Sequence, residues 1–221
     1  MLQRKNPTAA AGYLYILGTV AGVLSVILIG PVLDEPLSLL SSPKAEIRLT
    51  LSALAVLTMG LALALIPAVL YPILKKSHPV LASGYLVFRG ALETFTYLIS
   101  VLGWFFLISL SRSEAEVSSG LQEIYPVLLD GEFISEITTI VFVLGAVMFY
   151  FVLFEARLIP RWISGWGLIS TLPYLAAGSL VMFGVFDHMS TADTLLRIPL
   201  AIQEMVLAVW LIVKGINLNS T

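Results

Sequence analysis

The sequence predicts an all-α polytopic membrane protein, a bundle of six transmembrane helices with its N- and C-termini in the cytoplasm. Of the 221 residues, 58% are hydrophobic and only 12% are charged, whereas roughly a quarter of the residues of soluble domains are charged. The mean hydropathy is accordingly high, at +0.97. The apolar stretches leave only short loops between them, so we expect one integral membrane domain over residues 1–221.

The first predicted span follows from an uncharged stretch near the N-terminus. No charged residue occurs between Asn6 and Asp34, and a spanning helix needs about 20 residues. Arg4 and Lys5 precede the stretch, as in a signal peptide, but the apolar part of a signal peptide is only about 7 to 15 residues long. We therefore expect a retained first helix over residues 9–33.

Charged or helix-breaking residues separate five further apolar stretches. Lys75 follows the second stretch, and the acidic segment 112–133 follows the third. Pro160 lies between the fourth and the fifth, and Asp187 lies between the fifth and the sixth. The complete set of predicted spans is 9–33, 49–74, 80–110, 134–154, 163–185 and 195–213.

The distribution of lysine and arginine over the loops predicts the orientation, because cytoplasmic loops carry an excess of both. With the N-terminus inside, the outer loops hold most of the carboxylates. The inner side then carries Arg4, Lys5, Lys75, Lys76, Arg157, Arg161 and Lys214. Both termini are therefore expected to be cytoplasmic.

The third span carries two full charges near the middle of the membrane. Arg89 lies about 14 Å from the inner edge of this helix and Glu93 about 6 Å deeper, at 1.5 Å of rise per residue. At helical spacing they share one stripe with other polar side chains, and this stripe must face the protein interior. Its members are Tyr85, Arg89, Glu93, Thr96 and Ser100.

The sixth span repeats this pattern. Arg197 is near its outer end, and Glu204 lies seven residues further on, about 10 Å deeper and on the same face. Ala201 and Ala208 flank Glu204 at helical spacing, and small residues of this kind let a neighbouring backbone approach closely.

A lone charge at mid-membrane costs about 3 kcal/mol, so these charges should be paired. We predict one network of Arg89, Glu93, Arg197 and Glu204, with Gln203 and Tyr85 as satellites. Two interpretations remain open. The cluster is either a satisfied ion-pair clip that fixes helix packing or the lining of a cavity that binds an ion, a proton or a polar head group.

Several classes of function are excluded or disfavoured. The net charge is −2, and no basic stripe indicates nucleic-acid binding. Cysteine is absent, and the only histidines, His78 and His188, fall on opposite membrane sides, so we expect neither a metal site nor a cofactor. No nucleophile elbow, phosphate loop or zinc-protease motif occurs. An enzyme is thus disfavoured, although an Arg and Glu pair could catalyse acid/base chemistry on a lipid.

Two weaker signals each allow two interpretations. Gly18 and Gly22 form a GxxxG motif in the first span, which suits internal packing or a homo-oligomer interface. Glu136, beside Ser135, Thr138 and Thr139 at the outer end of the fourth span, suits a helix cap or an outer vestibule, and we favour the cap.

Four fragments together resemble a known family. They are LYPILKK at residues 70–76, GYLVFRGALE at 84–93, LIPRWISGWGLIS at 158–170 and IQEMVLAVWLIVKG at 202–215. They resemble the bacterial and archaeal family known as domain of unknown function 4386, from the first helix to Lys214. The resemblance implies a small multi-pass protein of a prokaryotic plasma membrane, with Arg89, Glu93 and Glu204 at its polar positions, and it implies no activity.

From the residues, we expect the protein to bind or transport a small anionic or zwitterionic ligand, a proton or a lipid head group at the buried charges. Arg89 and Arg197 would hold the anionic part of a ligand, and Glu93 and Glu204 would orient them or exchange protons. The alternatives are an intramembrane lipid-modifying enzyme and a sensor or accessory subunit with a purely structural charge cluster. The expected partners are membrane lipids and a small-molecule or ion ligand.

Overall fold

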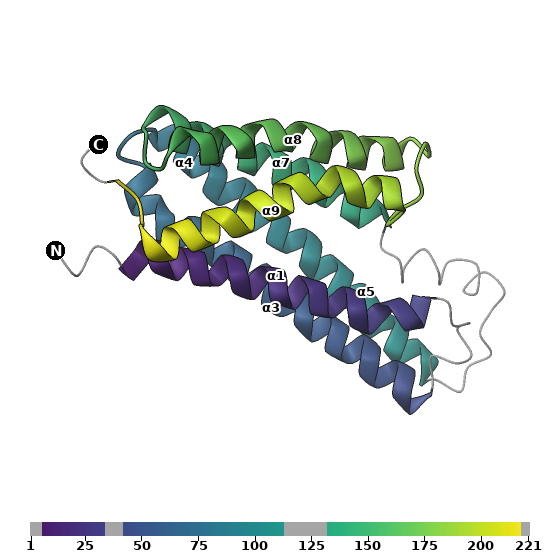
Figure 1. Ribbon diagram of the computed structural model, residues 1–221. Coiled ribbons are helices and arrows are strands. Elements are labelled where there is room, and N and C mark those ends of the chain that lie inside the picture. Colours follow the sequence, from purple (N-terminus) through teal and green to yellow (C-terminus); the bar gives the residue numbers. More distant parts are fainter. Residues whose placement is uncertain (1–5, 34–41, 113–131, 218–221) are drawn as a thin grey trace.

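The computed structural model describes residues 6–33, 42–112 and 132–217, which form six long helical segments (Figure 1). All six are long and apolar enough to cross a membrane, which confirms the predicted all-α, six-span architecture. The predicted orientation rests partly on Arg4, Lys5 and the acidic segment 113–131, which lie outside the described residues. The cytoplasmic location of the termini therefore stays a prediction.

The third span is built from three consecutive pieces. The helices and their bounds are α1 (Asn6–Leu33), α3 (Pro43–Leu74), α4 (Pro79–Tyr85), the π-helix η2 (Leu86–Leu92), α5 (Glu93–Ser111), α7 (Glu132–Glu155), α8 (Arg161–Met182) and α9 (Thr191–Val213). Together, α4, η2 and α5 form one continuous span over Pro79–Leu110.

Two helices begin earlier than predicted because serine residues cap them. The Ser42 hydroxyl accepts a hydrogen bond from the Ala45 amide at 3.3 Å, so α3 starts six residues before the predicted Leu49. In the same way, the Ser190 hydroxyl accepts from the Asp193 amide at 3.3 Å and starts α9 at Thr191. A serine cap satisfies amide groups that the first turn leaves without a partner, so the charged residues that follow can be helical.

The helices pack as two groups, one with α1, α3 and α5 and the other with α7, α8 and α9, and the groups diverge toward one end of the bundle (Figure 1). Helix α1 packs on α3 and α9, α3 packs on α5, and α8 lies between α7 and α9. We call the end where α1 begins and α9 ends the basic end. The charged residues that the structure describes there are Lys75, Lys76, Glu155, Arg157, Arg161 and Lys214. In Figure 1, α9 crosses α1 near the basic end, and the two groups spread apart toward the opposite end.

Large apolar side chains cover the outside of the bundle. Ile27, Leu102 and Leu172 are more than 60% exposed, on α1, α5 and α8 respectively. Such a surface would be costly in water, but it matches the hydrocarbon interior of a bilayer. Exposure therefore supports the same conclusion as helix length: these helices face lipid.

Close helix approach depends on glycines in α1. A Cβ atom on Gly18 would lie 2.9 Å from the side chain of Leu63, and one on Gly22 would lie 2.8 Å from the sulfur of Met59. Both contacts are with α3, so the GxxxG motif serves the internal packing of α1 on α3.

Replacing Gly12 with alanine is expected to destabilise the protein by about 1–3 kcal/mol, the usual cost of overpacking. The added Cβ would lie 2.6 Å from the Ala208 carbonyl oxygen and 2.6 Å from the Ile212 side chain, which would force α1 away from α9. Thermal unfolding in detergent measures the loss. The matched control is Gly30→Ala in the same helix, where nothing lies within 4 Å. Equal stability of the two variants would contradict the predicted contact.

Candidate functional site

The backbone around Arg89 is a π-helix, and it brings the arginine close to α7. The amide of Glu93 bonds to the carbonyl of Phe88, five residues back. Such wide turns are rare and are often found at functional sites. Helix α7 approaches this turn through Gly145, where an added Cβ would lie 3.2 Å from the Arg89 amide nitrogen. The third span therefore presents Arg89 directly against α7.

Arg89 is the centre of a three-residue ion cluster, which we call the central cluster. Its guanidinium donates to Glu93 from Nη1 at 2.8 Å and to Glu204 from Nη2 at 3.2 Å. The guanidinium also lies 4.5 Å from the centre of the Phe142 ring, in a cation–π arrangement. The predicted pairing of Arg89 with both glutamates is thus present, and Arg89 joins the third span to the sixth.

The two glutamates of the central cluster differ in environment. The Glu93 side chain is 1% exposed and accepts further hydrogen bonds, at 3.0 Å from Arg89 and at 2.9 Å from the Tyr97 hydroxyl. The Glu204 side chain is 17% exposed, whereas that of Arg89 is 4% exposed. Glu93 therefore anchors the arginine, and Glu204 is the member of the cluster that an incoming ligand could reach.

Arg197 does not join the central cluster, so the prediction of one four-residue network is wrong. Arg197 donates to Asp193 at 2.7 Å, to Thr139 at 2.9 Å and to Glu136 at 3.4 Å. The reason is depth: Arg197 and Glu204 are about 10 Å apart along α9, whereas Asp193 is one helical turn away. We call Glu136, Thr139, Asp193 and Arg197 the outer cluster.

Glu136 is a site residue whose role the sequence interpretation missed. It is the fifth residue of α7, too far into the helix to cap its start, and it is buried. One oxygen accepts from Arg197, and His188 Nδ1 lies 3.7 Å from that oxygen. The sequence did contain a signal for this role, because Ser135, Thr138 and Thr139 beside Glu136 mark an inward-facing polar stretch of α7.

Gln203 bonds away from the ions, so its prediction as a satellite is wrong, whereas Tyr85 lies within electrostatic reach of Arg89. Gln203 donates to the Ile163 carbonyl at 3.0 Å and accepts from the Tyr150 hydroxyl at 2.6 Å. The Tyr85 ring stacks on Phe149, with centroids 4.5 Å apart. Tyr85, and Tyr150 to which Gln203 bonds, belong to a buried layer on the basic-end side of the ions. We call this the aromatic layer, formed by Tyr15, Tyr85, Phe149 and Tyr150.

A cavity of about 580 Å³ brings the four predicted charges into one space. All six spans contribute to its wall, with residues from the middle of the bundle and from the end opposite the basic end. Apolar side chains such as Ile29, Met59 and Phe142 form much of the remaining lining. The aromatic layer lies on the basic-end side of the ions, and all four of its side chains are buried.

The cavity wall carries more carboxylates than guanidiniums. Glu93, Asp193 and Glu204 line it together with Arg89 and Arg197, which leaves one negative charge in excess while His188 is neutral. Glu136 adds another carboxylate behind Arg197. Such a wall can hold a cationic group or exchange protons at a carboxylate.

Six apolar helices around a charged cavity define a multi-pass integral membrane protein. The model of the family described as Domain of unknown function (DUF4386) matches residues 10–215, and the chain belongs to this family. The resemblance found in the four fragments is thereby confirmed. No curated protein and no solved structure matches the chain.

Proposed function

We propose that this protein binds a small organic cation or zwitterion in the central cavity and carries it across a prokaryotic plasma membrane. The observation that carries the proposal is the partial exposure of Glu204 beside the buried pair of Arg89 and Glu93. A purely structural clip would gain nothing from a carboxylate that faces an open space, because a fully paired ion is cheaper in a low-dielectric medium.

Charge favours a cationic group in the ligand. The excess of carboxylates would repel the purely anionic ligand considered from the sequence, whereas Glu204 can pair with an ammonium group. Arg197, whose side chain is 18% exposed, lies about 10 Å from Glu204 along α9. A zwitterion could therefore place its cationic part at Glu204 and its anionic part toward Arg197.

Size and polarity favour a small organic solute over a bare ion. Ligand pockets usually measure roughly 300–1,000 Å³ and combine apolar walls with a few polar groups, and this cavity has about 580 Å³ and both kinds of lining. Access from the side opposite the basic end fits the distribution of the lining residues. With the basic end in the cytoplasm, the cavity faces outward and the aromatic layer forms the inner barrier.

The Glu204→Gln variant is expected to lose cation binding and keep its fold. The probes are tetramethylammonium, glycine betaine and acetate, each titrated while thermal unfolding is followed in detergent. A ligand at 100 times its Kd stabilises by about 2.7 kcal/mol, so the cation and the zwitterion, which both carry a quaternary ammonium group, should raise the unfolding temperature of the parent protein and acetate should not. The matched control is Glu46→Gln, which removes a carboxylate near the end of the bundle opposite the basic end. This carboxylate lies outside the cavity.

The same experiment separates binding from the structural alternative. If no probe stabilises the parent protein, or if Glu204→Gln responds as the parent does, the cavity is not a cation site. A probe that binds is then tested for uptake into proteoliposomes. Binding without uptake would replace transport by a sensing or accessory role.

A further inference from the structure

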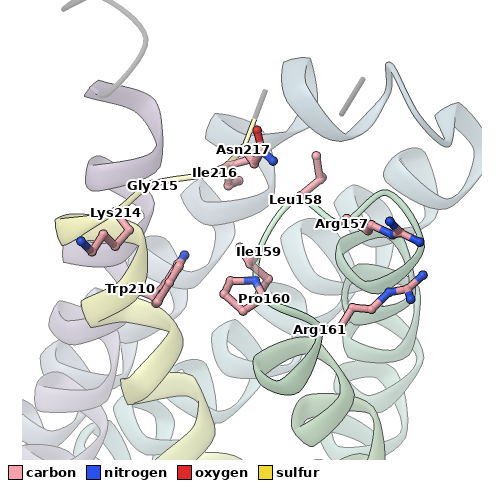
Figure 2. A pocket seen from close by; sticks show the side chains of 10 residues that line it. All are labelled: Arg157, Leu158, Ile159, Pro160, Arg161, Trp210, Lys214, Gly215, Ile216 and Asn217. Atoms are coloured by element: carbon pink, nitrogen blue, oxygen red, sulfur yellow. The ribbon is translucent and has the colours of Figure 1, made fainter. Parts of the chain in front are cut away.

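A second cavity, at the basic end, gathers three basic side chains around one hollow. It measures about 620 Å³ and lies between the start of α8 and the end of α9 (Figure 2). Its wall is formed by residues 157–161, Trp210 and residues 214–217. In Figure 2, the side chains of Arg157 and Arg161 extend outward on one side of the hollow and that of Lys214 extends outward on the other, so the charged ends lie at its rim, with Trp210 between Lys214 and Pro160.

All charged residues in the wall of this cavity are basic. Arg157, Arg161 and Lys214 contribute three positive charges, and no carboxylate is among the lining residues. The nearest acidic residue along the chain, Glu155, pairs with His78 at 3.0 Å instead. The three charges are therefore available to an anion.

The local backbone holds the cavity in shape. Arg157 has a φ of 49°, a left-handed conformation that a side chain other than glycine adopts only at a cost, and such residues concentrate at functional sites. The guanidinium of Arg161 lies 5.1 Å from the centre of the Phe154 ring. The amide of Asn217 donates to the Leu158 carbonyl at 2.8 Å, which joins the segment after α9 to the segment before α8.

The surroundings of the cavity are suited to lipid tails. Trp162, one residue into α8 from Arg161, is exposed, as are Val209 and Val213 at the end of α9. Helices α8 and α9 pack side by side, and these exposed apolar residues are next in the chain to the lining residues Arg161, Trp210 and Lys214. A free anion would make no favourable contact with these apolar side chains, whereas acyl chains would.

We propose that the basic-end cavity binds the phosphodiester head group of an anionic phospholipid. Arg157 and Arg161 would hold the phosphate oxygens, for which the planar guanidinium is well shaped, and Lys214 would add charge from α9. The acyl chains would run along the exposed faces of α8 and α9. Basic pockets between spans at the cytoplasmic face commonly hold lipid head groups, and this role is separate from the central cavity.

The test compares retained lipid in two double variants. Arg161→Gln/Lys214→Gln removes two cavity charges, and Lys75→Gln/Lys76→Gln removes two exposed charges at the same end that do not line the cavity. Each protein is titrated in detergent with phosphatidylglycerol or phosphatidylcholine, and bound lipid is counted by native mass spectrometry. We expect about a fivefold loss of phosphatidylglycerol affinity for each cavity charge removed and a much smaller loss in the control.

Three results would overturn the proposal. They are equal losses in the two double variants, equal retention of phosphatidylcholine and phosphatidylglycerol, and displacement of the lipid by inorganic phosphate at equal concentration, which would indicate a free-phosphate site. If the cavity double variant does not fold, Lys214→Gln alone serves, because its side chain is exposed at the end of α9. It should still lose about fivefold.

Discussion

The Arg89→Met variant is expected to lose about 3–5 kcal/mol of stability, the usual cost of leaving a buried charge without its partner. Glu93 would remain 1% exposed with only the Tyr97 hydroxyl as a donor, and Glu204 would lose its cation. Methionine keeps most of the length of the side chain and its contact with Phe142. Unfolding of the purified protein in detergent, by heat or by added sodium dodecyl sulfate, measures the change.

Two further variants show whether charge is the cause. The triple change Arg89→Met/Glu93→Gln/Glu204→Gln removes the whole central cluster and should restore most of the lost stability. Arg112→Met removes an exposed arginine, whose ion pair with Glu46 at the surface raises the pKa of Arg112, and should have little effect. A triple variant as unstable as Arg89→Met would mean that packing of the guanidinium, and not its charge, holds the helices together.

The Arg197→Met variant is expected to lose about 3 kcal/mol, at the low end of the range for buried pairs because the arginine itself partly faces the cavity. Asp193 and Glu136 are both buried and would keep their negative charges without a cation. Since one residue comes from α7 and one from α9, their repulsion should separate these helices at the end opposite the basic end. The same unfolding measurements apply.

Lys44→Met is the matched control for Arg197→Met, because it removes an exposed positive charge near the same end. Arg197→Lys should give an intermediate loss, since lysine keeps the charge but not the planar fork that reaches Asp193, Thr139 and Glu136 together. If Arg197→Met is within about 1 kcal/mol of the parent protein, where surface pairs fall, the two carboxylates do not depend on it.

The pairing of the central charges was predictable because it depends on spacing within one helix and on the cost of an unpaired charge in the membrane. Arg89 and Glu93 are one helical turn apart, so they can pair within their own helix. Glu204 was expected at the same depth as this pair, since both helices cross the same membrane. Hydrocarbon gives a charge no other partner, which made the contact between Arg89 and Glu204 a sound expectation.

The partner of Arg197 and the role of Glu136 were not predictable from the sequence in the same way. Arg197 has Glu204 on its own face but Asp193 closer, and which of them it meets depends on where α7 lies. The position of α7 beside α9 at this depth is a tertiary contact through α8. Without it, Glu136 resembled an ordinary acidic residue near a helix start.

By itself, the sequence determined that this is a six-span membrane protein with paired charges at its centre, because apolar length and the cost of a buried charge act on each helix independently. Only the tertiary structure decided that these charges form two clusters, that a π-helical turn presents Arg89 to α7, and that a cavity lies between them. Those features depend on the relative positions of helices far apart in the chain. Packing sets these positions, and no single helix encodes them.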